Sequence, residues 1–178
     1  MGNRETKFID GREVFACSAF SVREETFEFC DKNITRFLVT HPGAAVFLPR
    51  TASGTFLLVK QYRAALRCSI LEAPAGTLDK GEDPLDCAKR EIQEEVKHRA
   101  EKWTSLGIVH PAPGFCNEVQ HLYLAENLSA ASLEQDEDEV IEVCELTLSE
   151  IEEAIRSGSL ADAKTISLYA RAKAFGLI

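Results

Sequence analysis

Positive charge is scarce in this sequence. Lys and Arg number 20 against 29 Asp and Glu, which gives a formal net charge of −9. Non-specific binding to nucleic acid requires a basic surface that meets the phosphates. We therefore expect no nucleic-acid partner. An anionic substrate would have to be held by bound metal ions and a few well-placed arginines.

Long apolar runs and paired cysteines are also missing. No stretch approaches the roughly 20 apolar residues of a membrane span, and the first residues lack the hydrophobic block of a signal peptide. The six cysteines form no Cys-x-x-Cys pair, and the four histidines show no metal-ligand spacing. These absences predict a reduced, cytoplasmic protein with no membrane association and no zinc site.

The composition is that of an ordinary globular protein. The chain has 178 residues, of which 45% are hydrophobic and 28% are charged. This length suits one domain, and we see no internal repeat or linker. We therefore interpret residues 1–178 as a single domain.

Hydrophobic periodicity predicts an α/β protein whose first half is rich in strands. A turn of the chain is expected near 21–25, between the first two strands, and a capping box of Ser149 and Glu152 is expected to start the second helix. The expected strands lie within 12–30 (two strands) and at 34–40, 44–48, 55–62, 103–109, 118–125 and 140–146. The expected helices follow Asp83, run from 149 to about 156, and run from 162 to about 175 with Phe175 on the buried face.

The segment from Gly76 to His98 organises the chain. Asp83 is a good helix N-cap, and Pro84 suits the first helical position. Leu85, Ala88, Ile92 and Val96 then share one face, which can pack on a core. The preceding residues, 73–81, contain three helix and strand breakers and are expected to form a loop.

Three carboxylates crowd the side of this helix. Glu91, Glu94 and Glu95 fall together, and like charges at this spacing destabilise a helix by roughly 0.2–0.5 kcal/mol per pair. Such a cluster needs a compensating positive charge. We therefore expect it to hold a divalent metal ion.

The pattern of Gly76, Glu82, Arg90-Glu91-Ile92 and Glu94-Glu95 resembles the Nudix box, the signature of hydrolases that split nucleoside diphosphates linked to another group. The sequence departs from that box at Lys97-His98, where the family has glycine and an aliphatic residue. Either Lys97 takes the left-handed conformation that glycine favours, or the helix continues. Because basic residues suit a helix C-terminus, we expect a slightly extended helix with the carboxylates undisturbed.

Further segments resemble the ADP-ribose pyrophosphatase branch of this family. They are His41-Pro42-Gly43-Ala44, Gln61-Tyr62-Arg63, Leu71-Glu72-Ala73-Pro74-Ala75-Gly76, Ala112-Pro113-Gly114 and Asp138-Glu139. The resemblance implies a Nudix-type α/β/α sandwich with a mixed sheet, preceded by an N-terminal antiparallel sheet. It also implies magnesium-dependent cleavage of the diphosphate bridge of a nucleotide sugar, with manganese as a possible substitute. ADP-ribose is the first choice of substrate and GDP-mannose the next, and the products are a nucleoside monophosphate and a sugar phosphate.

The same resemblance implies roles for particular residues. Those at the metal ions are Glu91, Glu94, Glu95 and the carbonyl of Ala75, with Glu94 also in catalysis. Glu139 is the expected general base, with Glu137 in reserve. Those at the substrate are Arg63, Arg36, Glu72 and Glu118, each of which has an ordinary surface role as its alternative. Arg90 is expected to tie the helix to neighbouring acids.

The family resemblance also implies a homodimer in which the N-terminal strands, within residues 1–40, contribute to the partner's site. Two other functions stay open. One is a non-catalytic nucleotide-sugar sensor, which the loss of the terminal box glycine permits and the intact glutamates oppose. The other is a dinucleoside polyphosphate or nucleoside triphosphate hydrolase of the same family.

Overall fold

The computed structural model describes residues 6–133 and 141–178, which form two compact units. The first unit contains the chain up to Pro42 together with His110–Val119, and the second contains Gly43–Val109 and the chain from Gln120 onward. No helix within the described residues is long and apolar enough to cross a membrane.

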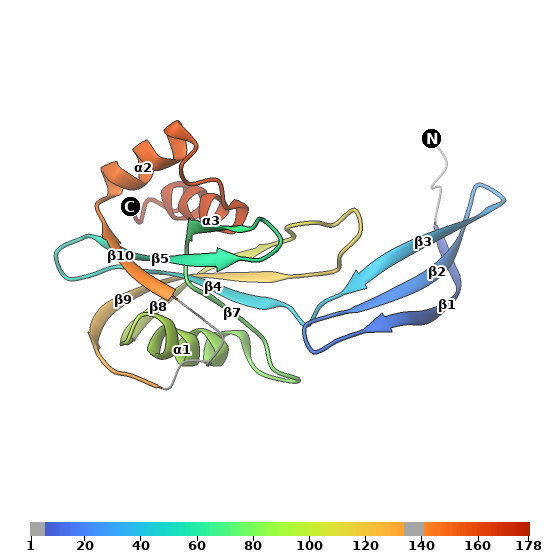
Figure 1. The fold of residues 1–178 in the computed structure, drawn as a ribbon, viewed down its shortest axis with the longest axis horizontal. Coiled ribbons are helices and arrows are strands. Elements are labelled where there is room, and N and C mark those ends of the chain that lie inside the picture. Colours follow the sequence, from blue (N-terminus) through green and yellow to red (C-terminus); the bar gives the residue numbers. More distant parts are fainter. Residues whose placement is uncertain (1–5, 134–140) are drawn as a thin grey trace. The chain divides into compact units, whose positions relative to one another are not determined.

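The first unit is built on an antiparallel sheet of three strands in the order β1-β2-β3 (Figure 1). The strands are β1 (Lys7–Ala16), β2 (Ser21–Phe29) and β3 (Lys32–Thr40). This sheet confirms the expected N-terminal antiparallel sheet. The expected turn near 21–25 was wrong, because Ser21 already pairs with Ala16 and the chain reverses through a bond from Cys17 N to Phe20 O of 3.0 Å.

The second unit contains two sheets and three helices. Its strands are β4 (Ala44–Pro49), β5 (Phe56–Arg63), β6 (Cys68–Glu72), β7 (Ala75–Thr77), β8 (His98–Val109), β9 (Gln120–Ala130) and β10 (Ile141–Leu146). Its helices are α1 (Pro84–Glu95), α2 (Leu148–Ser157) and α3 (Ala163–Ala174). One sheet has the order β7-β4-β9-β8 and is mixed, because only β4 and β9 run parallel; the other has the order β10-β5-β6 and is antiparallel.

The sheets lie between α1 on one side and α2 with α3 on the other (Figure 1). Strand β4 shows why this arrangement is stable, since all six of its residues are buried. Successive side chains of a strand point to opposite faces, so Val46 and Leu48 pack in the cluster with α2 and α3, whereas Ala45 and Phe47 pack in the cluster with α1. A fully apolar strand covered on both faces confirms the expected α/β/α sandwich.

The helix ends match the sequence in part. The last helix was expected to start at 162, and Asp162 is the N-cap of α3; Gly158 ends α2 with a φ of 79°. The capping box of α2, however, consists of Thr147 and Glu150 instead of Ser149 and Glu152, so the helix begins two residues earlier. Phe175 is 55% exposed and does not join the core, because α3 has already ended at Ala174.

Two short strands were not expected. β6 follows the turn after Arg63, and β7 lies inside the segment 73–81 that we interpreted as a loop. β7 forms because Ala75, Gly76 and Thr77 pair with Val46, Ala45 and Ala44 of the buried strand β4. A three-residue strand of this kind depends on its partner and leaves no periodicity in its own sequence.

Candidate active site

The start of α1 is fixed by its own side chains. Asp83 Oδ1 accepts a hydrogen bond of 2.9 Å from Leu85 N, and Pro84 occupies the first helical turn. Glu82 Oε2 accepts a bond of 2.9 Å from Asp79 N in the preceding turn. The capping expected from the sequence is therefore confirmed. It sets the rotation of α1, which decides where the glutamates of its last two turns point.

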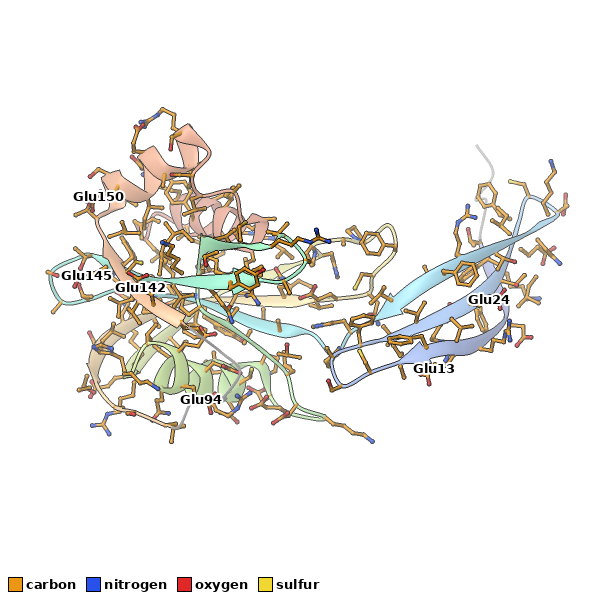
Figure 2. The ribbon with its side chains drawn as sticks, viewed as in Figure 1. Glu13, Glu24, Glu94, Glu142, Glu145 and Glu150 are labelled. Atoms are coloured by element: carbon orange, nitrogen blue, oxygen red, sulfur yellow. The ribbon has the colours of Figure 1, made fainter. Side chains whose placement is uncertain are left out.

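Arg90 holds the carboxylates of this helix together. Its Nε and Nη2 donate to Glu82 at 3.1 and 3.2 Å, and its Nη1 donates to Glu91 at 2.7 Å and to Glu94 at 2.9 Å. The hydrogen bonds from Arg90 lower the pKa of Glu82, and those same bonds raise the pKa of the guanidinium. Arg90 thus has the structural role expected from the sequence. Figure 2 shows Glu94 on α1, on the side of this unit opposite to Glu150 of α2.

Glu95 and Glu91 connect α1 to strand β7. Glu95 is only 4% exposed, and its Oε2 accepts a bond of 3.1 Å from Ala75 N. A Cβ atom on Gly76 would collide with the side chain of Glu91, so any larger residue at this position would displace that carboxylate. The glycine of the sequence motif is therefore required for close packing of strand and helix.

These carboxylates suit a hard divalent cation, which prefers oxygen ligands. Glu82, Glu91 and Glu94 all form ion pairs with Arg90, and Glu95 lies on the same helix as the last two. Within residues 6–133 and 141–178, no three Asp, Glu, His or Cys side chains are grouped closely enough to hold a metal ion. Arg90 bonds to Glu91 and Glu94, whereas the Ala75 amide bonds to Glu95. The donor set fits a cation in chemistry and in charge.

The end of α1 differs from our expectation. The helix does not continue: Val96 is its C-cap, Lys97 has a φ of 57°, and β8 begins at His98. Lys97 therefore takes the left-handed conformation in place of glycine. Its Nζ donates to Leu133 O at 3.2 Å, and its carbonyl accepts from Ala131 N at 3.1 Å. The pairing of β8 with β9, which starts at His98, overrides the preference of basic residues for a longer helix.

We expect Lys97→Gly to raise the free energy of unfolding by about 1 kcal/mol, because glycine adopts positive φ without the clash of a Cβ atom. The glutamates of α1 are left in place, so kcat/KM should stay within about threefold of wild type. Chemical denaturation and steady-state kinetics would measure both. Lys89→Gly, an exposed position inside α1, is the control and should lower stability by about 1 kcal/mol. A large gain in activity for Lys97→Gly would instead show that the native helix end lowers activity.

Arg63 and Glu72, two expected substrate residues, lie against each other. Arg63 Nε and Nη2 each lie 2.8 Å from Glu72 Oε1. Glu72 is 1% exposed, whereas the Arg63 side chain keeps 40% of its surface exposed. Arg63 is therefore the member of the pair that is available to a ligand.

Two other expected site residues belong to the first unit. Arg36 lies on β3, and Glu118 precedes β9. Arg36 Nη1 donates to the neighbouring Thr35 O at 3.1 Å, and Arg36 lines a shallow cavity with Thr6, Phe27, Phe29 and Ile34. Glu139 and its reserve Glu137 lie outside the described residues.

Sequence reasoning missed the residues that α3 contributes. Lys164 forms an ion pair with Glu72 Oε2, and Thr165 Oγ1 accepts a bond of 2.6 Å from Ala73 N. These contacts join positions 92 residues apart. No local pattern signals them, although Asp162 as a helix cap predicts that the side chains of the first turn of α3 are held in defined positions.

Cys87 is the one thiol in the motif helix, and the structure gives it a packing role. It is fully buried, and its Sγ lies 3.6 Å from both Gly76 O and Thr77 O. Burial raises its pKa to about 12, with Glu82 and Glu91 acting in the same direction. The thiol stays protonated at neutral pH and is not a nucleophile.

Comparisons with known proteins agree with this geometry. A NUDIX domain family model matches residues 39–169. An ADP-ribose pyrophosphatase of Bacillus subtilis is 39% identical over 168 residues, which cover 93% of this chain and 91% of that protein. A methanol dehydrogenase activator of Bacillus methanolicus is 37% identical over 91% of this chain and 89% of its own length. A GDP-mannose pyrophosphatase of Yersinia enterocolitica is 31% identical over 93% and 94%.

A crystal structure described as an ADP compounds hydrolase superposes with a TM-score of 0.82 at 20% identity, and the match covers all of both chains. The fold and the site together define an α/β sandwich protein that presents a carboxylate cluster suited to a divalent cation. The chain belongs to the Nudix family.

Proposed function

We propose that this Nudix hydrolase cleaves the diphosphate bridge of nucleotide sugars, giving a nucleoside monophosphate and a sugar phosphate. ADP-ribose is the first substrate and GDP-mannose the second, in keeping with the names of the relatives at 39% and 31% identity. The observation that carries the proposal is that Arg90 bonds to Glu91 and Glu94 on α1, while Glu95 of the same helix bonds to the Ala75 amide of β7.

The metal ligands in this proposal are Glu91, Glu94, Glu95 and the carbonyl of Ala75, and the ion is Mg²⁺, with Mn²⁺ as a substitute. A bound divalent ion neutralises phosphate charge and lowers the pKa of a coordinated water. The protein's part is to hold the ligands: capping and packing fix α1, and Arg90 and the Ala75 amide orient the carboxylates. We assign Glu94 to catalysis as well, because it lies beside Glu91 with a more exposed side chain (21% against 12%).

Proton transfer in this proposal is the task of Glu139, with Glu137 in reserve. The carboxylate accepts a proton from the attacking water as the water oxygen bonds to phosphorus and the bond to the bridging oxygen breaks. Support comes from sequence position alone, since Glu139 stands two positions before the first residue of β10, Ile141.

Arg63 is our proposed phosphate-binding residue. A guanidinium can form a fork of two hydrogen bonds with phosphate oxygens, and its 40% exposure leaves room for a ligand. Glu72 is buried under it, so we propose that this carboxylate serves the substrate by holding Arg63. Arg36 and Glu118, on the first unit, remain proposed substrate contacts.

We expect Arg63→Ala to raise KM about tenfold with kcat changed by less than about threefold, because the guanidinium contacts the substrate before reaction as well as during it. Steady-state kinetics with ADP-ribose at saturating magnesium would measure this. Arg67→Ala, in the turn that follows β5, is the control and should leave both constants unchanged. A fall in kcat at constant KM would show that Arg63 acts only in the transition state.

We further propose a homodimer formed through the β1-β2-β3 sheet. That sheet exposes several large apolar side chains, and exposed apolar patches of this kind mark interaction surfaces. They include Phe8 (52%), Phe15 (53%) and Phe37 (62%). A second copy of this chain would cover them and could bring Arg36 to its site. The six free cysteines fit a reducing, cytoplasmic location.

Phe37→Ser is expected to shift the protein from the mass of a dimer to that of a monomer in light scattering coupled to gel filtration, because it removes the most exposed ring of this sheet. Phe175→Ser, at another exposed ring (55%) after α3, should leave the mass unchanged. A monomeric wild type, or a dimer that survives the Phe37 change, would contradict the proposed interface.

A turnover screen with magnesium tests the activity directly. The panel comprises ADP-ribose, GDP-mannose, other nucleotide sugars, dinucleotides and triphosphates. We expect the highest kcat/KM with ADP-ribose and release of AMP. Preference for dinucleotides or triphosphates would favour the other hydrolases of the family, and no turnover by a folded protein would favour a sensor.

Activation of a dehydrogenase is a second candidate, favoured by the 37% identity to the Bacillus methanolicus activator. It is compatible with the same carboxylate cluster, since a hydrolase can act on a dehydrogenase through a diphosphate-containing nucleotide. Adding the protein to a methanol dehydrogenase assay, with Glu95→Gln as the inactive control, would show whether it stimulates alcohol oxidation.

A further inference from the structure

The ion pair beneath Arg63 contains a second cation. Glu72 Oε1 lies 2.8 Å from both Nε and Nη2 of Arg63, and Glu72 Oε2 forms an ion pair with Nζ of Lys164. Only 1% of the Glu72 side chain and 10% of the Lys164 side chain are exposed. Lys164 is therefore too buried for direct contact with a substrate. Its contact with Glu72 is unlike the surface ion pairs that contribute little.

The first turn of α3 holds Lys164 in this position. Asp162 Oδ2 accepts bonds from Thr165 N at 2.9 Å and from Thr165 Oγ1 at 2.5 Å, and it lies 3.2 Å from Lys164 Nζ. Thr165 Oγ1 in turn accepts from Ala73 N at 2.6 Å. Ala73, the residue after Glu72, is thus hydrogen-bonded to Thr165, the residue after Lys164. This bond holds the end of β6 close to the first turn of α3.

Arg63 and Lys164 contact different oxygens of the Glu72 carboxylate. An arginine beside a free carboxylate tends to form a fork across both oxygens. Here Lys164 occupies Oε2, so Arg63 is confined to Oε1 and uses two of its five N–H groups there. The other three N–H groups of Arg63 belong to a side chain that keeps 40% of its surface exposed.

We propose that Lys164 is a positioning residue for substrate binding: by occupying Glu72 Oε2, it prevents Arg63 from turning inward and keeps the guanidinium available to a phosphate of the substrate. This inference rests on the proposed role of Arg63. Removing the ammonium would leave a buried carboxylate oxygen without its partner, which is costly. Arg63 is the cation already in contact with Glu72, and it would rotate to satisfy both oxygens.

The test uses Lys164→Met, which keeps the length of the stem and removes the charge. We expect KM for ADP-ribose, and the calorimetric Kd for a methylene-bridged ADP-ribose analogue that cannot be cleaved, to rise about tenfold, with kcat within about threefold of wild type. Lys173→Met is the matched control on the same helix, because Lys173 also forms an ion pair, at 2.8 Å with the half-buried Glu152. The control should change neither constant.

A double-mutant cycle separates positioning from general support of the fold. In an Arg63→Ala background, Lys164→Met should raise the Kd of the analogue no further, because the residue it positions is absent. Lys164→Gln, whose amide can still donate to Glu72 Oε2, keeps the test available if the Met variant does not fold. It should raise Kd by about threefold in wild type and not at all with Arg63→Ala.

Different results would overturn different claims. An unchanged Kd in folded Lys164 variants, or an equal rise with and without Arg63, would overturn the positioning role alone. If Arg63→Ala leaves Kd unchanged, the assignment of Arg63 under the proposed function fails, and the positioning role fails with it. Absence of analogue binding by the wild-type protein would refute the proposed substrate class itself.

Discussion

Glu95→Gln is expected to lower kcat by at least about 10²-fold, on the scale of losing one preorganised charge contact in an active site. Glu95 is buried beside Ala75, and its carboxylate accepts the Ala75 amide at 3.1 Å. Glutamine has the same shape and can still accept that bond through its carbonyl oxygen. It lacks the negative charge that a divalent cation requires, so metal binding should weaken while core volume is kept.

Two measurements other than turnover make this result specific. Calorimetry with Mn²⁺ should show weaker metal binding by the variant, and thermal unfolding without metal should show a Tm no lower than that of wild type, because one of several like charges has been removed. Glu101→Gln, at an exposed position of β8, should behave as wild type throughout. Unchanged kcat for Glu95→Gln at saturating magnesium would refute the metal assignment.

The elements that sequence predicts well are those whose signals are local. Helix α1 begins where Asp83 and Pro84 predict, because the cap joins two residues that are only two positions apart. Strand β4 is recognisable because burial on both faces leaves an unbroken apolar run. By contrast, β7 exists only because β4 offers it a partner, and three residues carry too little pattern to predict it.

Contacts in the site also differ in whether local sequence predicts them or only packing creates them. Glu91, Glu94 and Glu95 share a helix face, so their proximity follows from helical geometry. The contact of Lys164 with Glu72 joins α3 to β6 across 92 residues, and only packing of α3 on the core creates it. At Lys97 a local signal gave a wrong prediction. The preference of basic residues for a helix C-terminus favoured a longer helix there, but the register of β8 with β9 fixes His98 opposite Ala130 and forces the chain to turn.

Glu139→Gln is expected to lower kcat by a factor of about 10² to 10⁴, the range for loss of a general acid or base. The change keeps the size of the side chain but removes the carboxylate that we propose as the acceptor of the proton of the attacking water. The proposed metal ligands of α1 and the proposed phosphate-binding Arg63 are left in place, so KM should stay nearly constant. A group that acts only in the transition state lowers kcat without changing substrate affinity.

Steady-state kinetics of Glu139→Gln beside Arg63→Ala gives the sharpest form of this test, because the two variants should show opposite patterns. Arg63→Ala raises KM and spares kcat, whereas Glu139→Gln lowers kcat and spares KM. Binding of the uncleavable ADP-ribose analogue should be normal in Glu139→Gln, which excludes a loss of folding or of substrate affinity. If Glu139→Gln instead raises KM and spares kcat, the base lies elsewhere. Glu137 and Glu118 are then the next carboxylates to replace, and the one whose loss lowers kcat at constant KM is the base.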